Sequence, residues 1–105
     1  MQNKDNINPD HYKSETSLEC IEAMEIIFGP AAVIDFAMCN AWKYIWRWKH
    51  KNGLEDLYKA RWYTEHAYGL IPDDTDISDE RIKFLNNLMH YICKNIEETE
   101  DKMNE

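Results

Sequence analysis

The sequence has few of the residues that mark secreted, membrane-spanning or zinc-binding proteins. It contains three cysteines, Cys20, Cys39 and Cys93, with no CxxC pair and no clustered His/Cys spacing. No stretch approaches the about 18 uncharged apolar residues of a membrane span, and the polar residues 1–10 lack the apolar run of a signal peptide. These absences argue against a disulfide framework, structural zinc and secretion, so we expect a cytoplasmic protein.

Glycine is equally scarce. The three glycines, Gly29, Gly53 and Gly69, each follow a segment of helical character, and we expect all three to end helices. The chain therefore has no GxxxxGK[ST] motif and no other glycine-rich loop that would cradle a phosphate, which excludes a P-loop kinase. The HExxH and GxSxG patterns are absent as well.

Acidic residues outnumber basic ones, with 20 Asp and Glu against 12 Lys and Arg, for a net charge of −8. The acidic residues gather at 73–80 and 97–105, which is typical of a solvated face and tail. The net negative charge disfavours DNA as a partner. The basic exception is a run of four cations within nine residues: Lys43, Arg47, Lys49 and Lys51.

Hydrophobic periodicity predicts four helices and no strand. Thr16 and Glu19 form an S/T-x-x-E capping box, which predicts a helix from about Ser17 to Phe28. Further helices are expected over 31–50, 54–68 and 78–100, the last capped by Ser78. We therefore predict an all-α bundle or orthogonal array in one small domain, 1–105. It would comprise a flexible, irregular arm at 1–15, a three-helix region at 16–69 and a C-terminal helix at 78–100.

The helix expected at 31–50 is apolar almost all round, which is typical of a buried helix. One narrow stripe breaks the pattern, because Asn40, Lys43, Tyr44 and Arg47 recur at i, i+3, i+4 and i+7. An amide, an ammonium and a guanidinium on one ridge suit a phosphate group. Alternatively, the cations pair with carboxylates of the next helix, such as Glu55 or Asp56.

The helix expected at 54–68 offers a matching face. Glu55, Lys59, Trp62 and His66 project together on it, so Lys59 would add a third cation. Tyr44, Trp62 or Tyr63 would stack on a base. In the alternative interpretation, Lys43, Arg47 and Lys59 form internal salt bridges and the aromatic residues belong to an ordinary core.

A second candidate site lies on the helix expected at 17–28. Glu19, Glu22 and Glu25 repeat as E-x-x-E-x-x-E, and carboxylates one turn apart can hold Mg²⁺. Helical nucleotide pyrophosphohydrolases use such a run together with a second E-x-x-D, for which Glu98 and Asp101 are the comparable pair here. A solvated acidic stripe is the competing interpretation.

Several short motifs occur in order between about Pro9 and Tyr68. They are His11–Tyr12, Leu18–Glu19–Cys20–Ile21–Glu22, Asn40–Ala41–Trp42–Lys43–Tyr44–Ile45–Trp46–Arg47, Asn52–Gly53–Leu54–Glu55–Asp56–Leu57 and Lys59–Ala60–Arg61–Trp62–Tyr63. This set resembles a small bacteriophage family of unknown function whose members are often labelled nucleotide-kinase-like. A larger relative, from a T-odd coliphage, is an unconventional kinase of deoxynucleoside monophosphates without a Walker motif.

The resemblance implies a virus-encoded protein of the host cytoplasm that binds a nucleotide. It implies a site formed by His11, Tyr12, Asn40, Lys43, Tyr44, Arg47, Asp56, Lys59 and Trp62. In a kinase, Lys43 and Arg47 would neutralise the transferred phosphoryl group. Asp56 or Glu19 would hold Mg²⁺ or accept the proton, and His11 would close the site.

Two other roles stay open at this point. The protein would sequester a nucleotide without chemistry, including a signal nucleotide of host defence, or it would act as an acidic phage factor that occupies a host protein. A homo-oligomer is also expected, because four tryptophans and six tyrosines exceed what a small core easily hides.

Overall fold

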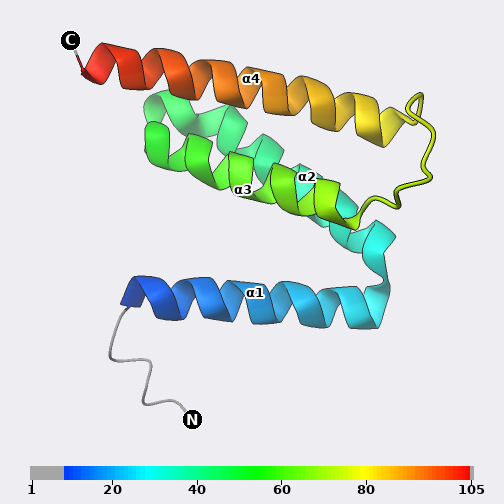
Figure 1. Cartoon of the computed structure of the whole chain (residues 1–105). Helices are drawn as coiled ribbons and strands as arrows, with labels where there is room; N and C mark the ends of the chain where they lie inside the picture. Colours follow the sequence, from blue (N-terminus) through cyan, green and yellow to red (C-terminus); the bar gives the residue numbers. More distant parts are fainter. Residues whose placement is uncertain (1–8, 105) are drawn as a thin grey trace. The chain divides into compact units, whose positions relative to one another are not determined.

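The computed structural model describes the backbone of residues 9–104 and the side chains of residues 19–104. This part of the chain contains four α-helices, one short 3-10 turn and no strand (Figure 1), which confirms the all-α prediction. The order is α1 (Pro9–Phe28), α2 (Pro30–Arg47), η2 (Trp48–His50), α3 (Leu54–Leu70) and α4 (Glu80–Met103). The chain divides into two compact units, Met1–Val33 and Ile34–Glu105, and the second holds both hydrophobic clusters.

Helix α1 begins at Pro9 rather than near Ser17, so residues 9–15 are helical and not part of an irregular arm. Proline suits a first helical turn, where no backbone N–H is needed, and the Thr16–Glu19 capping box therefore lies inside the helix. The helix ends as expected at Gly29, whose φ is 91° and whose N–H donates to the Glu25 carbonyl at 2.9 Å. Pro30 then opens α2.

The turn between α2 and α3 depends on Gly53. Its φ is 59°, and its N–H donates to the Trp48 carbonyl at 2.9 Å. This hydrogen bond closes the turn that follows η2. Helix α3 follows at once with Leu54. The expectation that Gly69 ends α3 is wrong, because the helix continues through it to Leu70. A glycine without a positive φ is tolerated inside a helix at a modest cost.

Helix α4 is capped by Asp79, whose carboxylate accepts the Arg81 N–H at 2.8 Å. The predicted cap, Ser78, instead donates its N–H and hydroxyl to Asp76, each at 2.8 Å. The helix runs to Met103, beyond the expected fraying at about 100, because Glu and Lys favour helix. None of the helices in the described part is long and apolar enough to cross a membrane.

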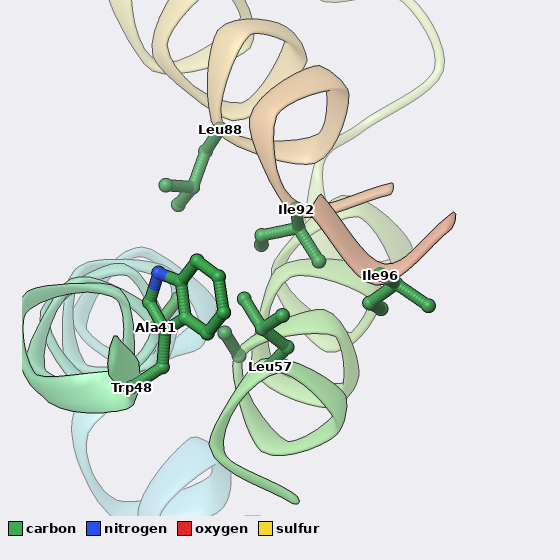
Figure 2. Packing of buried hydrophobic residues seen from close by; sticks show 7 residues of the cluster. Ala41, Trp48, Leu57, Leu88, Ile92 and Ile96 are labelled. Atoms are coloured by element: carbon green, nitrogen blue, oxygen red, sulfur yellow. The ribbon is translucent and has the colours of Figure 1, made fainter. Parts of the chain in front are cut away.

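The larger hydrophobic cluster of the second unit joins α2, η2, α3 and α4. Helices α3 and α4 are antiparallel neighbours, because Tyr58 near the start of α3 bonds Glu100 and Tyr68 near its end bonds Asn86. Figure 2 shows the Trp48 ring directed toward Leu57 and Leu88. The residues of this cluster are Ala41, Trp48, Leu57, Ala60, Leu88, Ile92 and Ile96.

One face of α2 departs from the expectation of a buried helix. Ala37 and Ala41 are fully buried, but the residues Trp42 and Trp46 are 49% and 72% exposed. Helix α2 therefore has a buried side and an exposed aromatic side.

A basic–aromatic cluster around Tyr44

Three cations from two helices surround the ring of Tyr44. Lys43 Nζ lies 4.7 Å from the ring centroid, the Arg47 guanidinium carbon 5.0 Å and Lys59 Nζ 5.6 Å. Lys43 and Arg47 come from α2, whereas Lys59 reaches the same ring from α3. Each cation is within the about 6 Å at which an aromatic face attracts a positive charge. The structure thus brings together the three cations that the sequence pattern singled out.

The aromatic side chains continue from this ring along α3. Tyr44 stacks on Tyr63, with centroids 6.1 Å apart and an interplanar angle of 15°. Tyr63 meets the edge of Trp62 at 5.0 Å, and Trp62 stacks on His66 at 5.3 Å. Trp62 keeps 37% of its surface exposed. We call Lys43, Tyr44, Arg47, Lys59 and Trp62 the Tyr44 cluster.

Asp56 holds Arg47 in place. The Arg47 Nε and Nη2 atoms each donate to the Asp56 carboxylate at 3.2 Å, and Asn52 donates through its backbone N–H and its amide at 3.2 and 3.3 Å. The Asp56 side chain is fully buried. Burial raises the pKa of Asp56, but the hydrogen bonds from Arg47 and Asn52 outweigh it, so the pKa lies below its usual value.

This geometry changes the role assigned to Asp56. The sequence suggested a catalytic carboxylate that would hold Mg²⁺ or accept a proton. The observed carboxylate is enclosed by the protein and occupied by four hydrogen bonds from Arg47 and Asn52. Asp56 therefore fixes the orientation of Arg47, and the hydrogen bonds between these two side chains raise the pKa of Arg47.

The salt-bridge interpretation holds for two of the three cations. Arg47 pairs with buried Asp56, and Lys59 Nζ lies 3.9 Å from a Glu55 carboxylate that is itself 67% exposed. Exposed pairs of this kind contribute little. Lys43 forms no ion pair with a carboxylate of the described residues, and it is exposed. Lys43 is thus a cation available to an outside anion.

The remaining predicted residues have no described contact with the Tyr44 cluster. His11 and Tyr12 lie on the first turns of α1, and their side chains fall outside the described residues. Asn40 donates its amide to the Phe36 carbonyl of its own helix at 2.9 Å. Glu19 and Glu22 are exposed on α1. Over the described side chains, no group of three or more His, Cys, Asp or Glu is placed to hold a metal ion.

Two residues near the cluster have contacts or burial that the sequence pattern did not predict. Asn52 donates to Asp56 through its backbone N–H and its amide. The sequence feature that could have predicted this contact is the position of Asn52, four residues before Asp56 and just ahead of a helix. The Nε2 atom of His66 is buried without a hydrogen-bond partner among the described residues. The pattern placed His66 on the right face of α3, one turn after Trp62, but gave no indication of its burial.

Comparison with known proteins identifies the family. The model of the family described as "Protein of unknown function (DUF3310)" matches residues 7–65, which is more than half of the 105-residue chain. The chain belongs to this family. The matched segment includes every member of the Tyr44 cluster and ends before α4. No curated protein and no solved structure matches the chain.

Proposed function

We propose that this protein binds the phosphate group of a nucleotide at the Tyr44 cluster. The observation that carries the proposal is the convergence of Lys43, Arg47 and Lys59 on one ring in a chain of net charge −8. Three like charges repel one another, and two protein carboxylates, Asp56 and Glu55, offset only part of that charge. An anion bound among them would offset the rest.

The binding groups are partly fixed in advance. Arg47 uses Nε and Nη2 toward Asp56, which leaves further guanidinium N–H donors for a phosphate oxygen. Its orientation is set by a buried partner rather than by the ligand, so little ordering is needed on binding. Lys43 and Lys59 are exposed and would close on the anion from the two helices.

Trp62 offers a surface for the base. It lies three residues after Lys59 on α3, so the two side chains are neighbours on the helix surface. One face of its ring stacks on His66, and 37% of the residue is exposed. Stacking of a base on an exposed aromatic ring is sequence-tolerant and contributes about 1–3 kcal/mol per base.

The same cations serve a kinase or a sequestering protein, and the geometry supports sequestration better. Phosphoryl transfer to a hydroxyl requires a group that accepts its proton or orients it. Of the two carboxylates predicted for that task, Asp56 is occupied by Arg47 and Asn52, and Glu19 is exposed on α1. Binding without chemistry requires only the cations and the aromatic surface. Phosphorylation of a deoxynucleoside monophosphate with ATP and Mg²⁺ remains the second candidate, supported by the resemblance of the sequence motifs.

The biological setting is part of this proposal. The motif resemblance supports a bacteriophage gene product that acts on nucleotides in the cytoplasm of its host. A homo-oligomer and a host-protein partner stay predictions.

Calorimetric titration with nucleotides tests the proposal. The panel holds deoxy- and ribonucleoside mono- and triphosphates and cyclic dinucleotides, with and without Mg²⁺. We expect one class to bind and Lys43→Ala to weaken it at least tenfold. Lys49→Ala is the matched control, because Lys49 is also exposed and lies over a different ring, that of Trp48, at 5.8 Å. Circular dichroism verifies that both variants remain helical.

Lys59 provides a second matched pair. Lys59→Ala should weaken binding, whereas Lys83→Ala should not, although Lys83 forms a similar helical pair with Glu80 at 3.7 Å. Equal effects of the two variants, or no binding by any nucleotide, would contradict the proposal. Release of ADP in the presence of a bound deoxynucleoside monophosphate, ATP and Mg²⁺ would favour the kinase over the sequestering protein.

A further inference from the structure

The exposed aromatic side of α2 faces α4 across a groove. Its larger hollow has a volume of about 440 Å³ and is lined from α2 by Trp42, Ile45 and Trp46 and from α4 by Phe84, Leu88 and Tyr91. A second hollow of about 400 Å³ shares Trp42 and Phe84 with it, so the two are adjacent. Volumes of about 300–1,000 Å³ are typical of sites for small organic molecules.

The lining of this groove is uncharged throughout the described residues, in a chain of which 30% of residues are charged. The Trp42 and Trp46 rings lie 6.3 Å apart at 47°, so they do not stack face to face on each other and their faces remain available. Burying an unpaired charge against such a surface is costly, whereas burying a flat apolar ring is favourable. The groove therefore suits a neutral, planar aromatic ligand.

Two polar groups give the groove a hydrogen-bonding edge. The Tyr91 hydroxyl accepts the indole N–H of Trp48 at 3.1 Å, so its own proton is directed elsewhere. Asn87 also lines the groove, four residues earlier on the same helix, and its amide is both donor and acceptor. Within the described part of the chain, neither the Tyr91 hydroxyl proton nor the Asn87 amide has a hydrogen-bond partner.

We infer that the groove between α2 and α4 binds a neutral, planar heteroaromatic molecule that carries a lactam edge, a carbonyl beside a ring N–H. The rings of Trp42 and Phe84 hold its plane. The Tyr91 hydroxyl donates to its carbonyl, and the Asn87 carbonyl accepts its N–H. At about 100° per residue, Trp42, Ile45 and Trp46 lie on the side of α2 away from Tyr44 and Arg47, so this site is separate from the Tyr44 cluster.

Indole N–H signals of the four tryptophans in a ¹H–¹⁵N NMR spectrum test the inference. They are assigned by single Trp→Phe variants. The probe is 2-quinolone, a bicyclic lactam, and the matched compounds are naphthalene, which lacks the edge, and 2-naphthoate, which is charged. We expect 2-quinolone to shift the signals of Trp42, Trp46 and Trp48 and to leave that of Trp62 unchanged. It should bind at least fivefold more tightly than either matched compound.

Variants separate the ring surface from the polar edge. Trp42→Ala should weaken the binding of 2-quinolone at least tenfold. Tyr58→Ala, which removes an exposed aromatic side chain outside both proposed sites, should have no effect. Tyr91→Phe keeps the aromatic ring but removes the hydroxyl. This variant should bind 2-quinolone no more tightly than naphthalene. The inference is overturned if no signal shifts at millimolar 2-quinolone, if naphthalene binds equally well, or if Trp62 responds in place of Trp42. It is also overturned if sedimentation shows a dimer that Trp42→Ala converts to a monomer, because a second copy would then cover the groove.

Discussion

Replacement of Asp56 tests how the connection between α2 and α3 is held. Asp56→Ala removes a buried carboxylate that accepts four hydrogen bonds from Arg47 and Asn52, at 3.2–3.3 Å. The same carboxylate lies in the first turn of α3, where a negative charge complements the helix dipole. Charge-assisted bonds contribute about 1.5–3 kcal/mol each, but here they share one acceptor group and Asn52 can regain water. We therefore expect a loss of about 3 kcal/mol rather than their sum.

Asp35→Ala is the matched control. Asp35 also forms a two-point pair with an arginine, Arg81, at 2.9 and 3.0 Å, which is shorter than the pair at Asp56. Its side chain is 56% exposed, so water replaces much of the lost interaction. We expect Asp35→Ala to cost less than about 1 kcal/mol. Burial, and not the length of the bonds, decides the difference between the two variants.

Urea denaturation followed by circular dichroism measures both free energies of unfolding, at pH 7 and at pH 2. Because the folded-state pKa of Asp56 lies below its unfolded value of about 3.9, its contribution is complete above that value. The contribution is lost as the pH falls through the folded-state pKa. The gap between the wild type and Asp56→Ala should therefore narrow toward pH 2. Equal losses for the two variants at pH 7, or a gap independent of pH, would refute this reasoning.

Two further predictions concern the backbone and the core. Gly53→Ala should destabilise the protein by about 1–3 kcal/mol, because the φ of 59° strains any side chain. Gly69→Ala, inside α3, should stabilise it by about 0.5–1 kcal/mol. Apart from the adjacent backbone, no atom lies within 4 Å of either added methyl group. Calorimetric melting temperatures moving in the same direction would contradict the assignment of Gly69 to the helix. Ile92→Ala, at a fully buried position, should cost about 2–5 kcal/mol, against less than about 0.5 kcal/mol for Ile77→Ala at a 79% exposed one, measured by urea denaturation.

Local signals predicted most of the fold. Periodicity and the Gly29–Pro30 and Asn52–Gly53 breaks placed the helices correctly, because these signals act within one turn of the chain. The errors arose where two local signals competed. Pro9 and the Thr16–Glu19 box are both helix starts, and the chain uses the first. Asp79, and not Ser78, caps α4, because the hydroxyl and N–H of Ser78 donate to Asp76 instead.

The candidate site was predictable to the extent that it lies along single helices. Helical spacing placed Lys43, Tyr44 and Arg47 on one ridge, and it gave Lys59 and Trp62 a shared face. It left open which carboxylate meets Arg47, because that depends on how α2 and α3 pack. The choice of Asp56 over Glu55, and the complete burial of Asp56, are tertiary facts with no counterpart in the periodicity.

The weak ion pair between Lys59 and Glu55 leads to a prediction opposite to that for the lysine variants, because removing Glu55 should raise nucleotide affinity rather than lower it. Glu55 lies 3.9 Å from Lys59 Nζ and competes with a bound phosphate for that cation. Glu55→Gln removes the competing charge and should tighten nucleotide binding about two- to fivefold, the range set by an exposed ion pair.

Glu80→Gln is the control for this change, because it breaks an equivalent exposed pair with Lys83 on α4 and should leave affinity unchanged. The enhancement should fade in high salt, where exposed charges are screened. If Glu55→Gln weakens binding while the protein remains folded, Glu55 acts with the ligand rather than against it. Lys59 would then serve to hold Glu55, and the phosphate would have to be assigned to Lys43 and Arg47 alone.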